Sequence, residues 1–269
     1  VRCNGYTDGW IDVSVFNGVD TLPYTYSWVV SNGGDLGGNA ANVEDLDSLV
    51  AGTYTCTVTD ANNCTTTEEV TITEPDSLVG GILASSQTIC YNTIPDTINT
   101  IVSPIGGNPP YTYDWSLDNG TGFISFPNGN NDFFSPSNLI ATTIYKVTYS
   151  DNYQCNTFTD SVTITVLPKV NPGSILESQI LCYADSASSL IVDSNNSPTG
   201  GVGSYYYQWQ SSLTGLSGSY IDLGVNNTIY SPGPMTTSTY YILEVTSIND
   251  TNCISRYTDS IYVHVYDSL

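Results

Sequence analysis

Seven cysteines are the residues with the clearest chemistry in this 269-residue chain, and six of them recur in a fixed order. In each of three repeats a leading cysteine comes first, a tryptophan follows, and a closing cysteine comes last. The leading cysteines are Cys3, Cys90 and Cys182, the tryptophans are Trp28, Trp115 and Trp209, and the closing cysteines are Cys64, Cys155 and Cys253. The regular spacing predicts one disulfide inside each repeat: Cys3–Cys64, Cys90–Cys155 and Cys182–Cys253.

Disulfides that close loops of this length each contribute about 4 kcal/mol by restricting the unfolded chain. They also indicate an oxidising, extracytoplasmic setting. Free thiols and metal ligands are the alternatives. A zinc site is disfavoured because the sequence has no CxxC pair and no histidine near these cysteines.

The seventh cysteine, Cys56, has no counterpart among the other six. The three strands that precede the closing cysteines align it with Val147 and Leu243. This alignment predicts a buried free thiol that packs as a small hydrophobic side chain. A reactive or intermolecular thiol is the alternative.

The remaining residues offer little for catalysis. The single histidine, His264, lies in the alternating stretch IYVHV, and a lone histidine provides neither a Ser-His-Asp triad nor a zinc site. Acidic residues cluster at 44–47 and at 68–69, which we interpret as solvated acidic faces rather than a glycosidase pair. The sequence therefore predicts a protein that is not an enzyme.

Two kinds of ligand remain open. Turns near Asp60, Asp151 and Asp250 carry Asp and Asn, whose oxygens suit calcium, although the same residues are ordinary turn formers and no DxDxDG loop is present. Tyr206 and Trp10 could stack on a sugar if they are exposed. Calcium and surface glycans are thus candidate partners.

The elements that must position these residues are strands. Thr, Val and Tyr are abundant, short alternating runs such as VTITV occur, and no window shows sustained helical periodicity. An aromatic phrase (PYTYSW, PYTYDW, YYYQW) places one tryptophan and its tyrosines on one face of a central strand in each repeat. We predict an all-β chain of three tandem immunoglobulin-like β-sandwiches, over residues 1–75, 76–168 and 169–269, in an elongated rod.

The charge limits the partners. The chain has 26 acidic and 4 basic residues, a formal charge of −22, which opposes binding to nucleic acid. The sequence contains no 18-residue apolar run, so no membrane insertion is expected. The second and third repeats begin with a leader of about ten residues that the first lacks. We interpret both chain ends as cuts; a first repeat that accepts a strand from a neighbouring subunit is the alternative.

The first repeat, with CNGYTDGWIDVSVFNG, PYTYSW and LVAGTYTCTVTDANNCTTTEEVTITEP, resembles an SprB-type repeat of the large surface adhesins of Bacteroidetes, which include the mobile adhesin of gliding motility. The other two repeats resemble the immunoglobulin-like and PKD-like modules of the same proteins, through GGNPPYTYDW, GSYYYQWQSS, TTIY and TSTYY. The resemblance implies export by the type IX secretion route and a place at the bacterial cell surface. It implies no particular ligand.

A recurring triplet of Asp, then Ser or Thr, then an apolar residue resembles the O-glycosylation acceptor of Bacteroidetes. The candidate acceptors are Thr21, Ser48, Ser77, Thr97, Ser161, Ser186, Ser260 and Ser268. Strand starts after turns explain the same triplets equally well.

From these observations we expect a non-enzymatic structural and adhesive segment of a long extracellular protein or filament, acting as a disulfide-stabilised stalk. Its partners would be neighbouring domains of the same chain or filament. A carbohydrate-binding module array of a secreted protein is the alternative.

Overall fold

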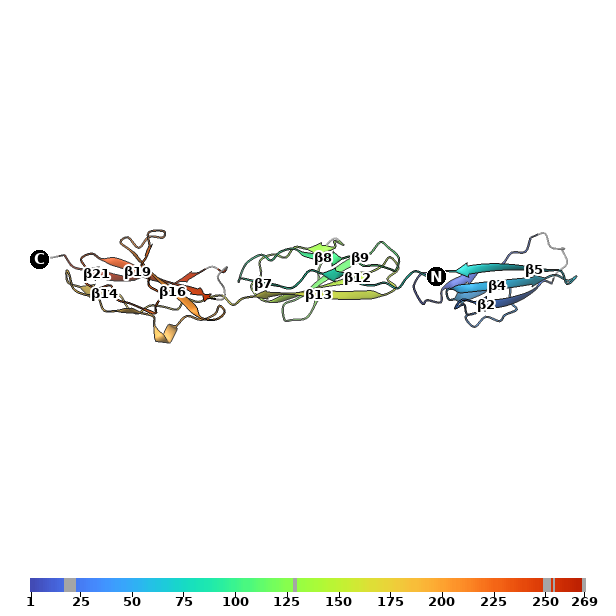
Figure 1. Ribbon diagram of the computed structural model, residues 1–269, viewed down its shortest axis with the longest axis horizontal. Helices are drawn as coiled ribbons and strands as arrows, with labels where there is room; N and C mark the ends of the chain where they lie inside the picture. Colours follow the sequence, from blue (N-terminus) through green and yellow to red (C-terminus); the bar gives the residue numbers. More distant parts are fainter. Residues whose placement is uncertain (17–22, 128–129, 249–252, 254, 268–269) are drawn as a thin grey trace. The chain divides into compact units, whose positions relative to one another are not determined.

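The computed structural model describes residues 1–16, 23–127, 130–248, 253 and 255–267, and these form strands and loops (Figure 1). The helical element whose bounds lie within these ranges is a short 3₁₀ turn, η1 (Ser194–Asn196). Within them, no helix is long and apolar enough to span a membrane. The chain divides into two compact units: the first comprises Val1–Ser85, Thr97–Ser135 and Ile144–Val162, and the second comprises Ser86–Asp96, Pro136–Thr143 and Thr163–Leu269.

The first repeat builds two antiparallel sheets. One has the order β2-β4-β5 and the other pairs β1 with β3. Their bounds are β1 (Gly9–Ile11), β2 (Thr25–Ser31), β3 (Leu46–Leu49), β4 (Gly52–Thr59) and β5 (Thr65–Ile72). The two sheets enclose one core, in which Leu46 and Leu49 of β3 meet Trp28, Tyr54, Cys56 and Val58 of β2 and β4.

The second repeat contains a five-stranded sheet, β10-β9-β12-β13-β7, and a three-stranded sheet, β11-β8-β6. The strands are β6 (Ile82–Leu83), β7 (Gln87–Ile89), β8 (Ile98–Val102), β9 (Thr112–Asp118), β10 (Ile124–Ser125), β11 (Phe133–Phe134), β12 (Thr143–Ser150) and β13 (Thr157–Val166). Trp115 of β9 is 1% exposed, and its ring centroid lies 5.9 Å from that of Phe134 on the facing sheet.

The third repeat repeats this plan. Its larger sheet has the order β14-β21-β19-β16-β17, with β20 also paired to β19, and its smaller sheet pairs β15 with β18. The strands are β14 (Gln179–Leu181), β15 (Leu190–Ile191), β16 (Tyr205–Ser212), β17 (Ile221–Asp222), β18 (Ile229–Tyr230), β19 (Thr239–Ser247), β20 (Arg256–Tyr257) and β21 (Ile261–Val265). Residues of both sheets, among them Leu190, Trp209 and Leu243, share one core.

The aromatic phrase forms the centre of each core. Trp28, Trp115 and Trp209 are 5%, 1% and 0% exposed, and their strand partners are Cys56, Val147 and Leu243. Each indole nitrogen donates to a backbone carbonyl, at 2.8 to 2.9 Å, of Val43, Asn131 and Asn227 respectively. Because a buried N–H needs an acceptor, this bond helps to hold the ring in place in each repeat. The all-β, immunoglobulin-like fold class is confirmed.

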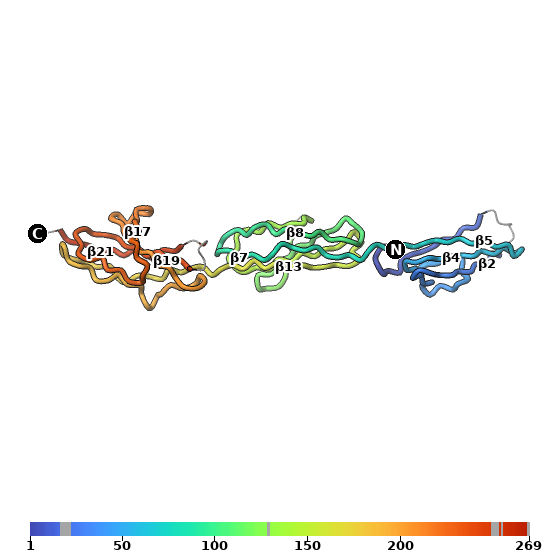
Figure 2. The backbone as a smooth tube through the Cα atoms, viewed as in Figure 1, coloured from blue at the N-terminus to red at the C-terminus, as the bar shows by residue number. Residues whose placement is uncertain are grey.

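Parallel pairing at one sheet edge distinguishes the second and third repeats from the first. The leader strands β7 and β14 lie parallel to the last strands β13 and β21; Figure 2 shows β7 beside β13. In the first repeat, β5 carries no such partner within the described ranges. An open groove of about 430 Å³ lies beside it, lined among others by Trp28, Cys56 and Val70. A strand accepted from a neighbouring subunit, which the sequence analysis gave as the alternative to cut chain ends, stays a prediction.

Candidate functional site: the cysteine turns and their disulfides

The disulfides join cysteines of successive repeats. The structure pairs Cys3 with Cys155 and Cys90 with Cys253, with Cα–Cα separations of 5.4 Å in both pairs. The prediction of one disulfide inside each repeat, Cys3–Cys64, Cys90–Cys155 and Cys182–Cys253, is therefore wrong. Cys64 and Cys182 carry no disulfide and are exposed. In both bonds a leading cysteine pairs with the closing cysteine of the next repeat.

The position of the last strand explains why pairing inside a repeat fails. Cys90 directly follows β7, whose Ile89 lies opposite Val166 at the end of β13. Cys155 precedes the start of β13, at Thr157. The ten residues of this strand span about 33 Å, whereas a disulfide needs Cα atoms within about 7 Å. The two cysteines of one repeat thus lie at opposite ends of its sandwich.

Each leading cysteine begins the same tight turn. The backbone N–H of the third residue after it donates to the cysteine carbonyl, at 3.1 Å for Cys3, 3.3 Å for Cys90 and 3.1 Å for Cys182. The second residue after it has a positive φ in every case: 73° at Gly5, 61° at Asn92 and 64° at Ala184. We call this segment the leading turn. Glycine adopts that conformation freely and asparagine tolerates it, so Ala184 is the residue whose turn depends on its surroundings.

The closing cysteines of the first two repeats end an equally regular hairpin. In the second repeat, Asp151 Oδ1 accepts from the backbone N–H of Tyr153 at 3.1 Å and of Cys155 at 3.0 Å. In the first, Asp60 Oδ1 accepts from Asn62 and Cys64, both at 2.8 Å. We call this segment the closing hairpin. The aspartate holds the cysteine backbone in one orientation, as in an Asx-turn.

Asp151 is 1% exposed and is held by further backbone donors. Burial by itself would raise the pKa of its carboxyl. Hydrogen bonds from the backbone N–H groups of Cys155, Asn108, Tyr153 and Gln154 outweigh that effect and lower the pKa below its usual value. The carboxylate is therefore charged, and both of its oxygens accept hydrogen bonds, from its own hairpin and from the neighbouring loop at Asn108.

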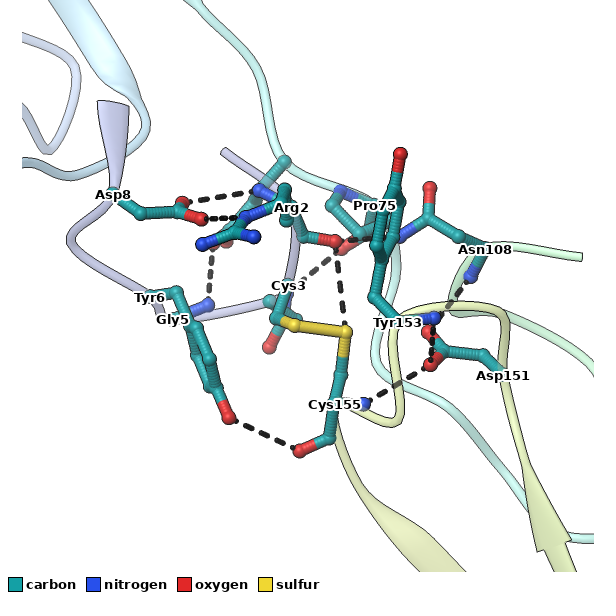
Figure 3. Close-up of a disulfide and its surroundings, with 12 residues drawn as sticks. Arg2, Cys3, Gly5, Tyr6, Asp8, Pro75, Asn108, Asp151, Tyr153 and Cys155 are labelled. Atoms are coloured by element: carbon teal, nitrogen blue, oxygen red, sulfur yellow. Dashed lines mark hydrogen bonds and ion pairs between the residues drawn. A yellow bond between two sulfur atoms is a disulfide. The ribbon is translucent and has the colours of Figure 1, made fainter. Parts of the chain in front are cut away.

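Figure 3 shows the surroundings of the Cys3–Cys155 bond. Tyr6 Oη donates to the carbonyl of Cys155 at 3.3 Å, and Asn108 Nδ2 donates to the carbonyl of Arg2 at 2.6 Å. Arg2 also pairs with Asp8 at 2.6 Å, and hydrogen bonds from the arginine lower the pKa of that carboxyl. Polar contacts thus align the two halves of this junction beside the disulfide itself.

The calcium hypothesis finds no support in these carboxylates. Asp60 and Asp151 bind their own backbone N–H groups, and Asp250 lies outside the described residues. Among the residues that are described, no three His, Cys, Asp or Glu side chains gather closely enough to hold a metal ion. Calcium binding stays a prediction.

The other candidate residues take no part in the disulfides. Cys56 is buried without a disulfide, and burial raises the pKa of its thiol, which lowers its reactivity. Tyr206 and Trp10 are 43% and 70% exposed. His264 lies on β21 with its Nδ1 3.3 Å from Ser238 Oγ. None of these side chains forms a catalytic constellation with another.

The glycosylation triplets share a simple geometry. Six of the candidate acceptors are exposed, and the apolar residue after each is buried: Ser48, Ser77, Thr97, Ser161, Ser186 and Ser260 precede Leu49, Leu78, Ile98, Val162, Ala187 and Ile261. Thr21 and Ser268 lie outside the described residues. The triplets thus anchor strands in the core while their hydroxyls face solvent.

A family model for a domain of unknown function (DUF8696) matches the chain twice, over residues 79–168 and 171–267, which make up well over half of it. The chain belongs to this family. Each DUF8696 match contains one leading and one closing cysteine: Cys90 with Cys155, and Cys182 with Cys253. No curated protein matches the sequence.

Several solved structures are similar to this DUF8696 chain. One comprises the three N-terminal domains of the Highly Immunogenic Outer Capsid protein (Hoc) of bacteriophage RB49, with 15% identity and a TM-score of 0.40 over 100% of this chain and 97% of that one. A three-immunoglobulin structure of titin has 10% identity and a TM-score of 0.47 over 91% and 89%. The insect immune protein hemolin has 13% identity and a TM-score of 0.38 over 99% and 73%. These likenesses concern the fold alone.

Proposed function

We propose that this chain is a non-enzymatic, load-bearing segment of an extracellular bacterial surface protein, and that its disulfides keep it covalently continuous. The observation that carries the proposal is that the two disulfides interleave along the sequence. Cys90 lies between Cys3 and Cys155, and Cys155 lies between Cys90 and Cys253. Three stretches of backbone, 3–90, 90–155 and 155–253, therefore each connect the same two bonds. Cutting any one of them leaves the other two intact.

The same connectivity limits how far the chain extends under force. With both bonds intact, the distance between them cannot exceed that of the shortest stretch, 90–155, which is about 220 Å when fully extended. Without them, the backbone from residue 3 to residue 253 extends to roughly 850 Å. The bonds thus restrict extension about fourfold, a useful property for a stalk that must not lengthen when pulled.

Single-molecule pulling of the whole chain tests the proposal. We expect a short total extension for the oxidised protein and the long one after reduction. The double variant Cys90→Ser/Cys253→Ser, which keeps the first bond, should give an intermediate value. A total extension near 850 Å for the oxidised wild-type chain would refute the load-bearing role of the bonds.

The cellular setting is supported by separate observations. Stable disulfides form in oxidising compartments, which favours an extracellular location. The resemblance of the first repeat to SprB-type repeats supports the surface of a Bacteroidetes cell and type IX export. Glycans on the six exposed acceptors would add a solubilising layer. Intact mass and glycopeptide mapping of native material check this: a mass equal to that of the peptide alone removes the glycans.

A carbohydrate-binding role is the second candidate, because Trp10 exposes 70% of its surface beside a hollow of about 480 Å³ that Arg2 and Asp8 also line. An exposed indole next to polar groups is a typical sugar platform. A glycan array with the wild-type chain and with Trp10→Ala tests this role. Reproducible binding that the variant loses would favour it over a purely structural one.

A further inference from the structure

Cys64 and Cys182 have the local structure of cysteines that form disulfides elsewhere in this chain. Cys64 ends a closing hairpin in which Asp60 holds the backbone as Asp151 does before Cys155, and Asn63 has a φ of 62° where Gln154 has 55°. Both hairpins precede the last strand of their repeat. Cys64 therefore presents the same local framework as Cys155, but it is exposed and unpaired.

Cys182 corresponds in the same way to Cys90. It follows β14 as Cys90 follows β7, and each of these leader strands is parallel to a last strand. The residue before each cysteine accepts a backbone bond: Ile89 from Leu167 at 2.9 Å, and Leu181 from Tyr266 at 3.0 Å. The leading turn that follows is the same in both. Cys182 is likewise exposed and unpaired.

Both existing disulfides obey one pairing rule, in which a leading cysteine bonds to a closing cysteine and never to another of its own kind. Cys182 is the leading cysteine that lacks a closing partner, and Cys64 is the closing cysteine that lacks a leading one. We propose that Cys182 of one copy of this chain forms a disulfide with Cys64 of a second copy, joining copies head to tail. The proposal goes beyond the load-bearing role, since it concerns how chains assemble.

The bond forms by two thiol–disulfide exchanges with a low-molecular-weight disulfide such as oxidised glutathione. A Cys64 thiolate attacks the reagent, whose S–S bond breaks and releases one reagent thiol. The Cys182 thiolate of the other copy then attacks the sulfur of Cys64 in the mixed disulfide and releases the second reagent thiol. Two protein thiols are oxidised, one reagent disulfide is reduced to two thiols, and the protons pass to those thiols.

Net charge works against the encounter. Each copy has a formal net charge of −22, so copies repel one another at low ionic strength, and added salt screens this repulsion. The joining reaction should therefore accelerate with ionic strength. A bond that depended on attraction between charges would show the opposite trend.

The test uses the full chain with its two native disulfides, incubated with oxidised glutathione in moderate salt. We expect a ladder of oligomers on non-reducing gels, which dithiothreitol collapses, and a cross-linked peptide that contains Cys64 and Cys182. Cys64→Ser and Cys182→Ser should each remain monomeric. Their mixture should give one dimer and no higher species, because one variant retains only Cys182 and the other only Cys64. The Cys56→Ser chain serves as the matched control and should form the full ladder.

Several results would overturn the proposal. One is that either single variant alone forms as much dimer as the mixture. A second is that the mixture forms no dimer. A third is a ladder held by Cys64–Cys64 and Cys182–Cys182 bonds. Peptide mapping of native surface material distinguishes the source of the partner. A Cys182 linked to a closing cysteine of a different sequence would replace the second copy by another protein module. Thermal melting of both variants as for wild type excludes misfolding as the cause of lost assembly.

Discussion

Removing the Cys3–Cys155 bond should destabilise the first repeat by about 4 kcal/mol. When that repeat unfolds while the second stays folded, the bond closes a loop of roughly 70 residues, from Cys3 to the joint near Pro75. Such a loop corresponds to about 4.4 kcal/mol of lost entropy in the unfolded chain. The pairing Cys3–Cys64 would close a loop of roughly 60 residues and contribute about 4.3 kcal/mol. The size of the stability loss therefore does not distinguish the two arrangements. They are distinguished by which cysteine, when replaced, causes the loss.

The matched variants are therefore Cys3→Ser/Cys155→Ser and Cys64→Ser. Hydrogen exchange of β4 at increasing denaturant reports the opening free energy of the first repeat without interference from the other two. We expect the double variant to lose about 4 kcal/mol, because its unfolded first repeat is no longer restrained. Cys64→Ser should match wild type within about 0.5 kcal/mol, since its thiol is exposed and unpaired. A loss of several kcal/mol in Cys64→Ser, with none in the double variant, would refute the pairing of successive repeats.

The remaining predictions concern buried groups and metal. Asp151→Asn should cost about 1–3 kcal/mol in urea unfolding and Asp60→Asn less, because only Asp151 is fully buried. Folding lowers the pKa of the Asp151 carboxyl, so the carboxylate stabilises the folded state fully above the unfolded pKa near 3.9 and loses this effect as pH falls through the lower folded pKa. Melting curves below pH 5 should show this loss of stability in wild type and not in Asp151→Asn. Burial raises the pKa of Tyr149 from 10.0 to about 12, so the stability that its neutral hydroxyl contributes is complete below pH 10 and is lost between pH 10 and 12. Tyr149→Phe should remove this fall from the plot of melting temperature against pH. Trp209→Phe leaves the carbonyl of Asn227 without its donor and should cost about 1–3 kcal/mol beyond the smaller ring, whereas Tyr206→Phe at an exposed site should cost almost nothing. A chelator should leave the melting temperature unchanged if the hairpin carboxylates are occupied as the structure has them, and a drop on chelation would restore the calcium hypothesis.

The strands and the core were predictable because they depend on local pattern. Alternation in YTCTV and VTITV gives β4 and β13. Buried positions alternate with partly buried ones from Tyr54 to Thr59 in β4 and from Val162 to Ile164 in β13. The aromatic phrase placed Trp28, Trp115 and Trp209 in the core. Alignment of the following strands predicted that Cys56 is buried, and the structure places it opposite Trp28. A period of two along a strand determines which side chains share a face, so one sequence was enough.

The disulfide partners were not predictable from spacing. Regular Cys…Trp…Cys intervals show that the cysteines recur. The same intervals are compatible with bonds inside a repeat and with bonds between successive repeats. A usable signal was present: the leading cysteine follows a leader strand, and the closing cysteine precedes the last strand. If these two strands are taken as parallel neighbours, their cysteines must lie at opposite ends of the sandwich. Antiparallel pairing is the more common arrangement, and nothing in the short runs QTI and QIL identifies their direction.

Joining neighbours rather than closing each repeat on itself changes connectivity, not folding free energy. The two arrangements restrict the unfolded chain by nearly the same amount, as the loop lengths show. With bonds inside the repeats, each joint would consist of one backbone strand. The joints between successive repeats lie near Pro75 and Pro168. Both carry exposed residues: Glu74 and Asp76 at the first, Pro168 and Lys169 at the second. Exposed joints are where proteases cut. In the observed arrangement the Cys3–Cys155 bond spans the first joint and the Cys90–Cys253 bond spans the second, so a cut at either joint releases no fragment until the disulfides are reduced.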